Sequence, residues 1–164
     1  TYERLLARLE GRGVRAVVDA TRDLLVNVLP FHPFLIKPNN HELGEIVGRT
    51  LTTDTDITAA ARTLQEKGAR NVLVSMAGDG ALLVDEQGQV HRIGCPKGKV
   101  VNSVGAGDSM MATLCHGVEK GMSFIDTCRL AMAVSAATVM CSGTQAASMD
   151  TVRELLPKVE IETL

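Results

Sequence analysis

The sequence predicts an α/β fold built on a mainly parallel sheet with helices on both faces. Short apolar runs alternate along the chain with segments of helical periodicity, which is the order that a parallel sheet with crossover helices requires. The runs at 14–19, 34–36 and 71–75 are short and rich in Val, Leu and Ile, as buried strands are. Because 164 residues suit one domain, we expect residues 1–164 to form a single domain.

Apolar spacing, glycine and proline set the first elements. Residues 1–10 place apolar side chains at helical intervals and are followed by two glycines, so they predict a helix. The β-branched run 14–19 predicts a strand. Thr21 can cap a helix that continues to residue 29, because Pro30 stops it there.

The middle of the chain continues the alternation. A strand at 34–36 leads into a short helix at 39–47, which Gly48 ends. The segment 52–56 offers several N-cap residues for a helix that Gly68 ends. The apolar stripe of that helix consists of Ile57, Ala60, Ala61 and Leu64. Residues 71–75 form the next apolar strand.

The second half begins with two apolar runs, 81–84 and 89–93. They flank Asp85-Glu86-Gln87-Gly88, so they predict a hairpin. Ser123 and Asp126 have capping-box spacing at the start of a long Ala-rich segment. Three helices are predicted here, over 105–120, over 123–141 and from Ser148 to just before Pro157.

Composition excludes several classes of partner. The formal net charge is -2 and aromatic residues make up 2% of the chain, which argues against a basic surface or stacking platform for nucleic acid. No apolar run reaches the length of a membrane span. The four cysteines show no CxxC or other metal-site spacing. We therefore expect a cytoplasmic protein with reduced thiols and with no nucleic-acid or membrane partner.

The strongest chemical signal is the segment 102–109, NSVGAGDS, which opens the helix predicted over 105–120. Its two glycines, Gly105 and Gly107, let the backbone turn sharply and let another atom approach closely. The free N–H groups of a first helical turn, together with the helix dipole, favour an anion at that point. The segment therefore predicts a turn that can hold a phosphate.

Asp108 has two interpretations from its local setting. An acid in the first turn complements the helix dipole. A carboxylate beside an anion site also suits a general base that takes a proton from an attacking hydroxyl group, and phosphoryl transfer needs this pairing. The segment fits poorly with a GxGxxG dinucleotide motif, because the third glycine would fall at Met110. A P-loop is excluded because GxxxxGK[ST] does not occur.

A second patch, KPNNHE at 37–42, follows a predicted strand. Asn39 and Glu42 have the spacing of a capping box, which is the structural interpretation. The functional interpretation places Asn39, Glu42 and Lys37 near Mg²⁺-bound phosphates at the carboxyl ends of the strands.

A third patch, SMAGDG at 75–80, also leaves a strand. One interpretation is a tight turn into the following hairpin, for which glycine is suited. The other is a loop that contacts a nucleotide through Ser75, Gly78 and Gly80. Local sequence alone leaves both open.

In this order and spacing, the three patches resemble the ribokinase-like carbohydrate kinases of the phosphofructokinase-B (pfkB) family. NSVGAGDSMMA at 102–112 closely matches the C-terminal signature of that family, and KPNxxE and the turn after Ser75 match two other landmarks. The resemblance covers residues 14–156 and implies the C-terminal half of a ribokinase-like fold. In one departure, Ala77 stands where the family usually has glycine.

The resemblance implies a role for each patch. Asp108 would be the general base that activates the sugar hydroxyl. The anion hole for the transferred phosphoryl group would consist of Gly105, Ala106 and Gly107. ATP and Mg²⁺ are the implied cofactors, and Glu42 would hold the metal through water. The residues implied to lie near the nucleotide or its metal are Lys37, Asn39, Glu42, Ser75, Gly78 and Gly80.

The implied reaction transfers a phosphoryl group from MgATP to a small sugar phosphate. The acceptor would be fructose 1-phosphate and the product fructose 1,6-bisphosphate. Tagatose 6-phosphate or another carbohydrate is the alternative acceptor, and a nucleotide-binding module without turnover is the alternative of a different class. The family's N-terminal sugar pocket, and the β-sheet lid that pairs subunits into homodimers, have no counterpart in this sequence. We therefore expect the ATP-binding and catalytic part of a longer enzyme, inactive by itself.

Overall fold

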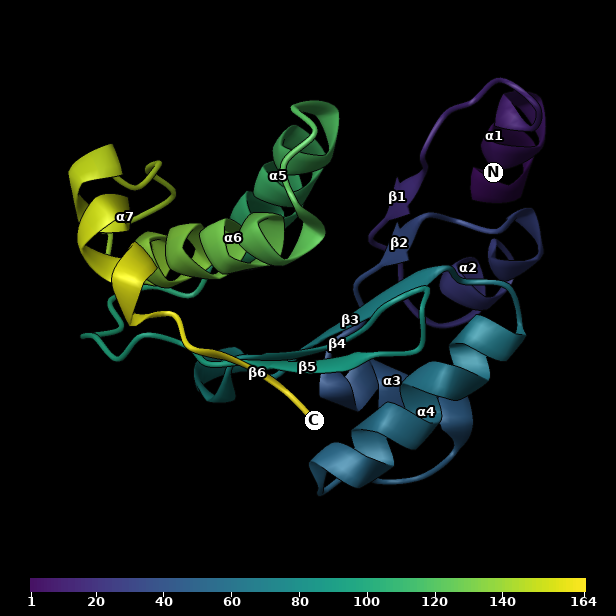
Figure 1. Ribbon diagram of the computed structural model, residues 1–164, viewed down its shortest axis with the longest axis horizontal. Coiled ribbons are helices and arrows are strands. Elements are labelled where there is room, and N and C mark those ends of the chain that lie inside the picture. Colours follow the sequence, from purple (N-terminus) through teal and green to yellow (C-terminus); the bar gives the residue numbers. More distant parts are fainter. The chain divides into compact units, whose positions relative to one another are not determined.

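The computed structural model describes residues 1–164, and its helices and strands are labelled in Figure 1. Its six strands form one sheet in chain order: β1 Val17–Val18, β2 Leu35–Ile36, β3 Asn71–Ser75, β4 Ala81–Val84, β5 Val90–Ile93 and β6 Ile161–Thr163. The first three strands are parallel to one another, and β3 pairs with β4 in antiparallel register. The α/β class is therefore confirmed.

The sheet is mixed, whereas the sequence predicted a mainly parallel one. The link between β3 and β4 is residues 76–80. A parallel pair needs a crossover of about a dozen residues or more, so this short link forces β4 to turn back along β3. The strand β6 was not predicted, because only Ile161 in it carries an apolar side chain.

All seven predicted helices are present. They are α1 Tyr2–Leu9, α2 Arg22–Val26, α3 Asn40–Val47, α4 Asp54–Glu66, α5 Ala106–Glu119, α6 Phe124–Val139 and α7 Met149–Leu155. Three short 3₁₀ turns accompany them: η1 Leu29–Phe31, η2 Ala77–Asp79 and η3 Leu156–Lys158. The helix predicted over 21–29 is divided into α2 and η1, because Pro30 lacks the N–H group that an α-helix would need there. None of the helices has the length and apolar character to cross a membrane.

A reciprocal cap sets the start of α4. The hydroxyl oxygen of Thr53 accepts a hydrogen bond from the backbone N–H of Asp56 at 3.1 Å, and the Asp56 carboxylate accepts from the N–H of Thr53 at 3.1 Å. The hydrogen bond from the Thr53 hydroxyl is the main reason that the pKa of Asp56 lies below its ordinary value. The predicted apolar stripe of this helix is buried.

The chain divides into two compact units. The first comprises residues 1–76, 81–91 and 163–164, and the second comprises 77–80 and 92–162. In the first unit, α4 packs on β3 and β4, and α3 contacts β3 and α4 (Figure 1). Its core contains Leu25, Ile36, Leu43 and Leu64, all 0% exposed. The prediction of one domain over residues 1–164 stays a prediction.

The second unit is organised around two long helices, α5 and α6, which pack along each other (Figure 1). A Cβ atom at Gly117 of α5 would lie 2.4 Å from the Thr127 side chain of α6, so only glycine permits this approach. The helix α6 also contacts α7 and η3. This packing holds α5 against α6, and the glycine-led turn begins α5.

Candidate active site

The parallel strands β1, β2 and β3 bring their carboxyl ends to one edge of the sheet in the first unit. Asp19 directly follows β1, Lys37 directly follows β2, and Ser75 ends β3. An isolated parallel bridge joins Asn39 to Ser75, whose backbone N–H donates to the carbonyl of Pro38 at 3.1 Å. Ligands of α/β proteins bind at this edge. The structure thus brings together Lys37, Asn39 and Ser75, three of the predicted site residues.

Asn39 and Glu42 form the capping box of α3. The Asn39 side-chain oxygen accepts from the backbone N–H of Glu42 at 2.8 Å, and Oε2 of Glu42 accepts from the N–H of Asn39 at 2.9 Å. Both side chains are half-buried. The structural interpretation of this pair is therefore confirmed, while its role toward a nucleotide stays a prediction.

Lys37 is buried beside Asp19, an acid for which no role was predicted from the sequence. Its side chain is 8% exposed, and Nζ lies 3.4 Å from Oδ2 of Asp19, whose side chain is 38% exposed. Lysine is almost never buried without a partner, and Asp19 supplies that partner. The sequence signal was an acid immediately after a strand, which gains meaning only once β1 and β2 are known to be neighbours.

The residues of the turn after β3 differ in backbone conformation and in the room available for a side chain. Ala77 has φ +49°, a left-handed backbone that glycine adopts more easily. Gly80 has φ +91°, and a Cβ atom there would lie 2.0 Å from the carbonyl oxygen of Ile93. A Cβ atom on Gly78 would meet nothing within 4 Å. Packing therefore explains Gly80 but not Gly78.

The second unit holds the glycine-led start of α5. Gly105 is the N-cap residue with φ +84° and ψ −5°, and it carries no side chain to cap the helix. The first helical hydrogen bond runs from the N–H of Ser109 to the Gly105 carbonyl at 2.9 Å. The N–H of Ala106 donates to the Ser103 carbonyl over 3.4 Å, whereas those of Gly107 and Asp108 have no acceptor within the protein.

The loop before this turn is held from two sides. The side-chain oxygen of Asn102 accepts from the N–H of Val104 at 3.0 Å, and its amide nitrogen donates to the carbonyl of Gly143 at 2.9 Å. Asp108 and Gly107 are exposed on the first turn of α5. The turn thus presents free N–H donors and an accessible carboxylate, the two groups that phosphoryl transfer requires.

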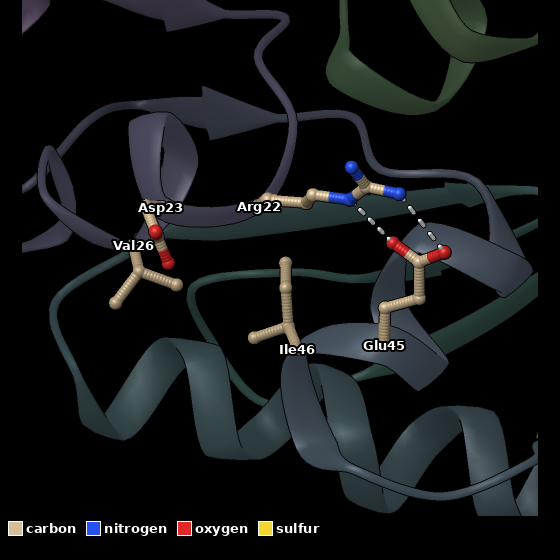
Figure 2. Close-up of a pocket in the computed structure, with 5 residues that line it drawn as sticks. All are labelled: Arg22, Asp23, Val26, Glu45 and Ile46. Carbon is tan, nitrogen blue, oxygen red and sulfur yellow. Dashed lines mark hydrogen bonds and ion pairs between the residues drawn. The ribbon is translucent and has the colours of Figure 1, made fainter.

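A pocket of about 340 Å³ lies elsewhere in the first unit, between α2 and α3. Figure 2 shows the residues that line it, among them Arg22 and Glu45, whose Nε and Oε2 atoms lie 2.9 Å apart. Their mutual hydrogen bond raises the pKa of Arg22 and lowers that of Glu45. None of the predicted site residues lines this pocket.

No group of three or more His, Cys, Asp or Glu side chains is arranged to hold a metal.

The first unit supplies parallel strands whose carboxyl ends share one edge of the sheet, and the second supplies a glycine-led helix with an acid in its first turn. The family model for pfkB family carbohydrate kinases matches residues 1–152. The chain belongs to the pfkB family of carbohydrate kinases.

The sequence is 38% identical over 164 residues to the 1-phosphofructokinase of Bacillus subtilis (strain 168), covering 100% of this chain and 53% of that protein. A candidate phosphofructokinase from Staphylococcus aureus has a similar structure, with a TM-score of 0.92, 36% identity, and coverage of 99% of this chain and 52% of that one. The ribokinase of Arabidopsis thaliana shares the fold at 23% identity, with a TM-score of 0.83 over 94% of this chain and 51% of that one. The chain thus spans about half the length of these relatives.

Proposed function

We propose that this chain carries the ATP-binding and catalytic part of a kinase that transfers a phosphoryl group from ATP to a sugar phosphate. The start of α5 supports this most directly. It combines the free N–H group of Gly107, one of the predicted anion-hole residues, with the exposed carboxylate of Asp108 on the same turn. A relative named 1-phosphofructokinase favours fructose 1-phosphate as acceptor and fructose 1,6-bisphosphate as product.

In this proposal Asp108 accepts the proton of the attacking hydroxyl group. The backbone N–H groups of Gly105, Ala106 and Gly107 hold the negative charge of the phosphoryl group, aided by the positive end of the α5 dipole. The bond from Ala106 to the Ser103 carbonyl is long at 3.4 Å, so a phosphoryl oxygen can replace that acceptor at little cost. Amides fixed by the helix need no reorganisation when charge develops.

Lys37, Asn39 and Ser75, at the sheet edge of the first unit, would border the nucleotide. The proposal also assigns nucleotide contacts to Gly78 and Gly80, which follow β3 in the chain. The donor set fits Mg²⁺ when phosphates and water supply most of its ligands, because the cap uses Oε2 of Glu42 and leaves Oε1 for a metal-bound water. The metal would neutralise charge on the ATP phosphates. As part of the same proposal, the complete enzyme works in the cytoplasm and pairs as a homodimer.

Two alternatives differ from this proposal in acceptor or in class. Tagatose 6-phosphate or another carbohydrate is the acceptor if the pocket that selects the sugar differs from that of the curated relatives. A nucleotide-binding module without turnover is favoured by one observation, that the chain spans about half the length of those relatives. In that case ATP binds to the chain but no sugar phosphate is converted.

Coupled-enzyme assays of ATP consumption separate these possibilities. Each assay would contain MgATP and either fructose 1-phosphate or tagatose 6-phosphate. The proteins compared would be the 164-residue chain and, where the gene encodes one, a longer protein that contains it (the longer product). We expect turnover of fructose 1-phosphate by the longer product and ATP binding without turnover by the chain alone. Absence of both turnover and ATP binding would refute the proposal.

A further inference from the structure

We propose that Asp19 is a positioning residue, whose carboxylate holds the ammonium group of Lys37 at the carboxyl edge of β1–β3 for contact with the phosphates of ATP. The inference rests on the proposed function, because it takes ATP as the ligand of that edge. It assigns a role to an acid that the sequence pattern left unexplained.

The backbone determines that this pair forms. In the parallel register Val18 lies opposite Ile36, so the next residue on each strand is Asp19 and Lys37. The N–H of Lys37 donates to the carbonyl of Val18 at 3.3 Å, which ties the two strand ends together. The pair is therefore a direct consequence of pairing β1 with β2.

The side chains of Lys37 and Asp19 differ in burial, so their roles differ. The Lys37 side chain is 8% exposed and the Asp19 side chain is 38% exposed. Asp19 is the carboxylate within ion-pair distance of Nζ, so it is the group that makes a buried ammonium tolerable. Without it the ammonium group would leave its place for water.

The ion pair also leaves Lys37 able to bind a second anion. The 3.4 Å approach to Oδ2 of Asp19 is an ion pair rather than a close hydrogen bond. An ammonium group has three N–H donors, and 8% of the Lys37 side chain remains exposed. A phosphoryl oxygen arriving at the edge can therefore accept from Lys37 while Asp19 keeps the group in place.

The test compares ATP with adenosine, which lacks phosphates. Calorimetric titration of the chain in magnesium buffer would measure both dissociation constants for the wild type and for Asp19→Asn. We expect Asp19→Asn to weaken ATP binding about tenfold, because one charge-assisted contact is lost, and to change adenosine binding less than about twofold. Asp19→Glu, which keeps the carboxylate, should recover most of the ATP affinity. Asp23→Asn, on the exposed face of α2, is the matched control and should change neither constant.

A double-mutant cycle keeps the test decisive if Asp19→Asn folds poorly. In a Lys37→Met background the buried ammonium is gone, so adding Asp19→Asn should leave the ATP affinity unchanged. Equal losses for ATP and adenosine would show a purely structural role, and unchanged or tighter ATP binding would show that Asp19 does not position Lys37. Either outcome would overturn this inference and leave the proposed function standing. A wild-type chain that binds no ATP would overturn the proposed function as well.

Discussion

Replacing Gly80 with alanine tests how the turn after β3 is built. Gly80 lies between η2 and β4 with φ +91°. An added Cβ atom would lie 2.0 Å from the carbonyl oxygen of Ile93 and 3.0 Å from the backbone nitrogen of Cys95. Both neighbours are backbone atoms, so no side chain can rotate away to relieve the contact.

Two costs add for this substitution. A left-handed backbone costs a residue with a side chain about 1–2 kcal/mol. The clash requires the end of β5 to shift, and overpacking of this kind costs about 1–3 kcal/mol. We therefore expect Gly80→Ala to lower the free energy of unfolding by about 2–5 kcal/mol, a large part of a typical total of about 5–15 kcal/mol.

Urea denaturation followed by circular dichroism at 222 nm measures this change. Gly78→Ala is the matched control, because a Cβ atom there meets nothing within 4 Å, and we expect it to change stability by less than about 0.5 kcal/mol. If Gly78 borders ATP as proposed, Gly78→Ala should instead weaken ATP binding. A Gly80→Ala variant as stable as the wild type would refute the packing argument.

Three further changes follow from local geometry. Ala77→Gly removes a left-handed alanine, so it should raise the free energy of unfolding by up to about 1 kcal/mol in the same assay, and a decrease would contradict this. Burial raises the pKa of the Cys128 thiol to about 12, so a disulfide reagent at pH 8 should label exposed Cys115 in the native state and Cys128 only after unfolding; equal rates would contradict the burial. Asp56 has a lowered pKa in the folded state, so below about pH 4 the unfolded chain takes up the proton first and stability falls. Urea titrations between pH 3 and 6 should show a shallower fall for Asp56→Asn, and identical slopes would rule out this contribution.

Local signals predicted the helices well because their causes lie within a few residues. The Asn39–Glu42 cap spans four residues and forms as the sequence indicates, and the N-cap Thr53 lies in the segment 52–56 that offered several N-cap residues. The sheet was harder to predict, because pairing depends on distant partners. The last strand is fixed by a bond from the N–H of Leu164 to the carbonyl of Val90, which no local pattern reveals.

The candidate site divides in the same way. The glycine-led turn at Gly105 could be predicted from the sequence, because a positive φ and a helix start are local properties. The ion pair between Asp19 and Lys37 could not be predicted, because it depends on the register of β1 against β2. The sequence could not separate Gly78 from Gly80 either, since their difference comes from the approach of Ile93.

The central claim is that the Asp108 carboxylate is the general base. Measuring the turnover of an Asp108→Asn variant, made in the protein that shows kinase activity, tests it most directly. Asp126→Asn is the control, because Asp126 is also a first-turn acid but on α6, away from the glycine-led turn. If the Asp108 carboxylate is the general base, its loss should lower kcat by about 10²- to 10⁴-fold with ATP affinity unchanged, while Asp126→Asn keeps full turnover. An Asp108→Asn enzyme with near-normal kcat, or one that loses ATP binding in proportion to kcat, would contradict the account.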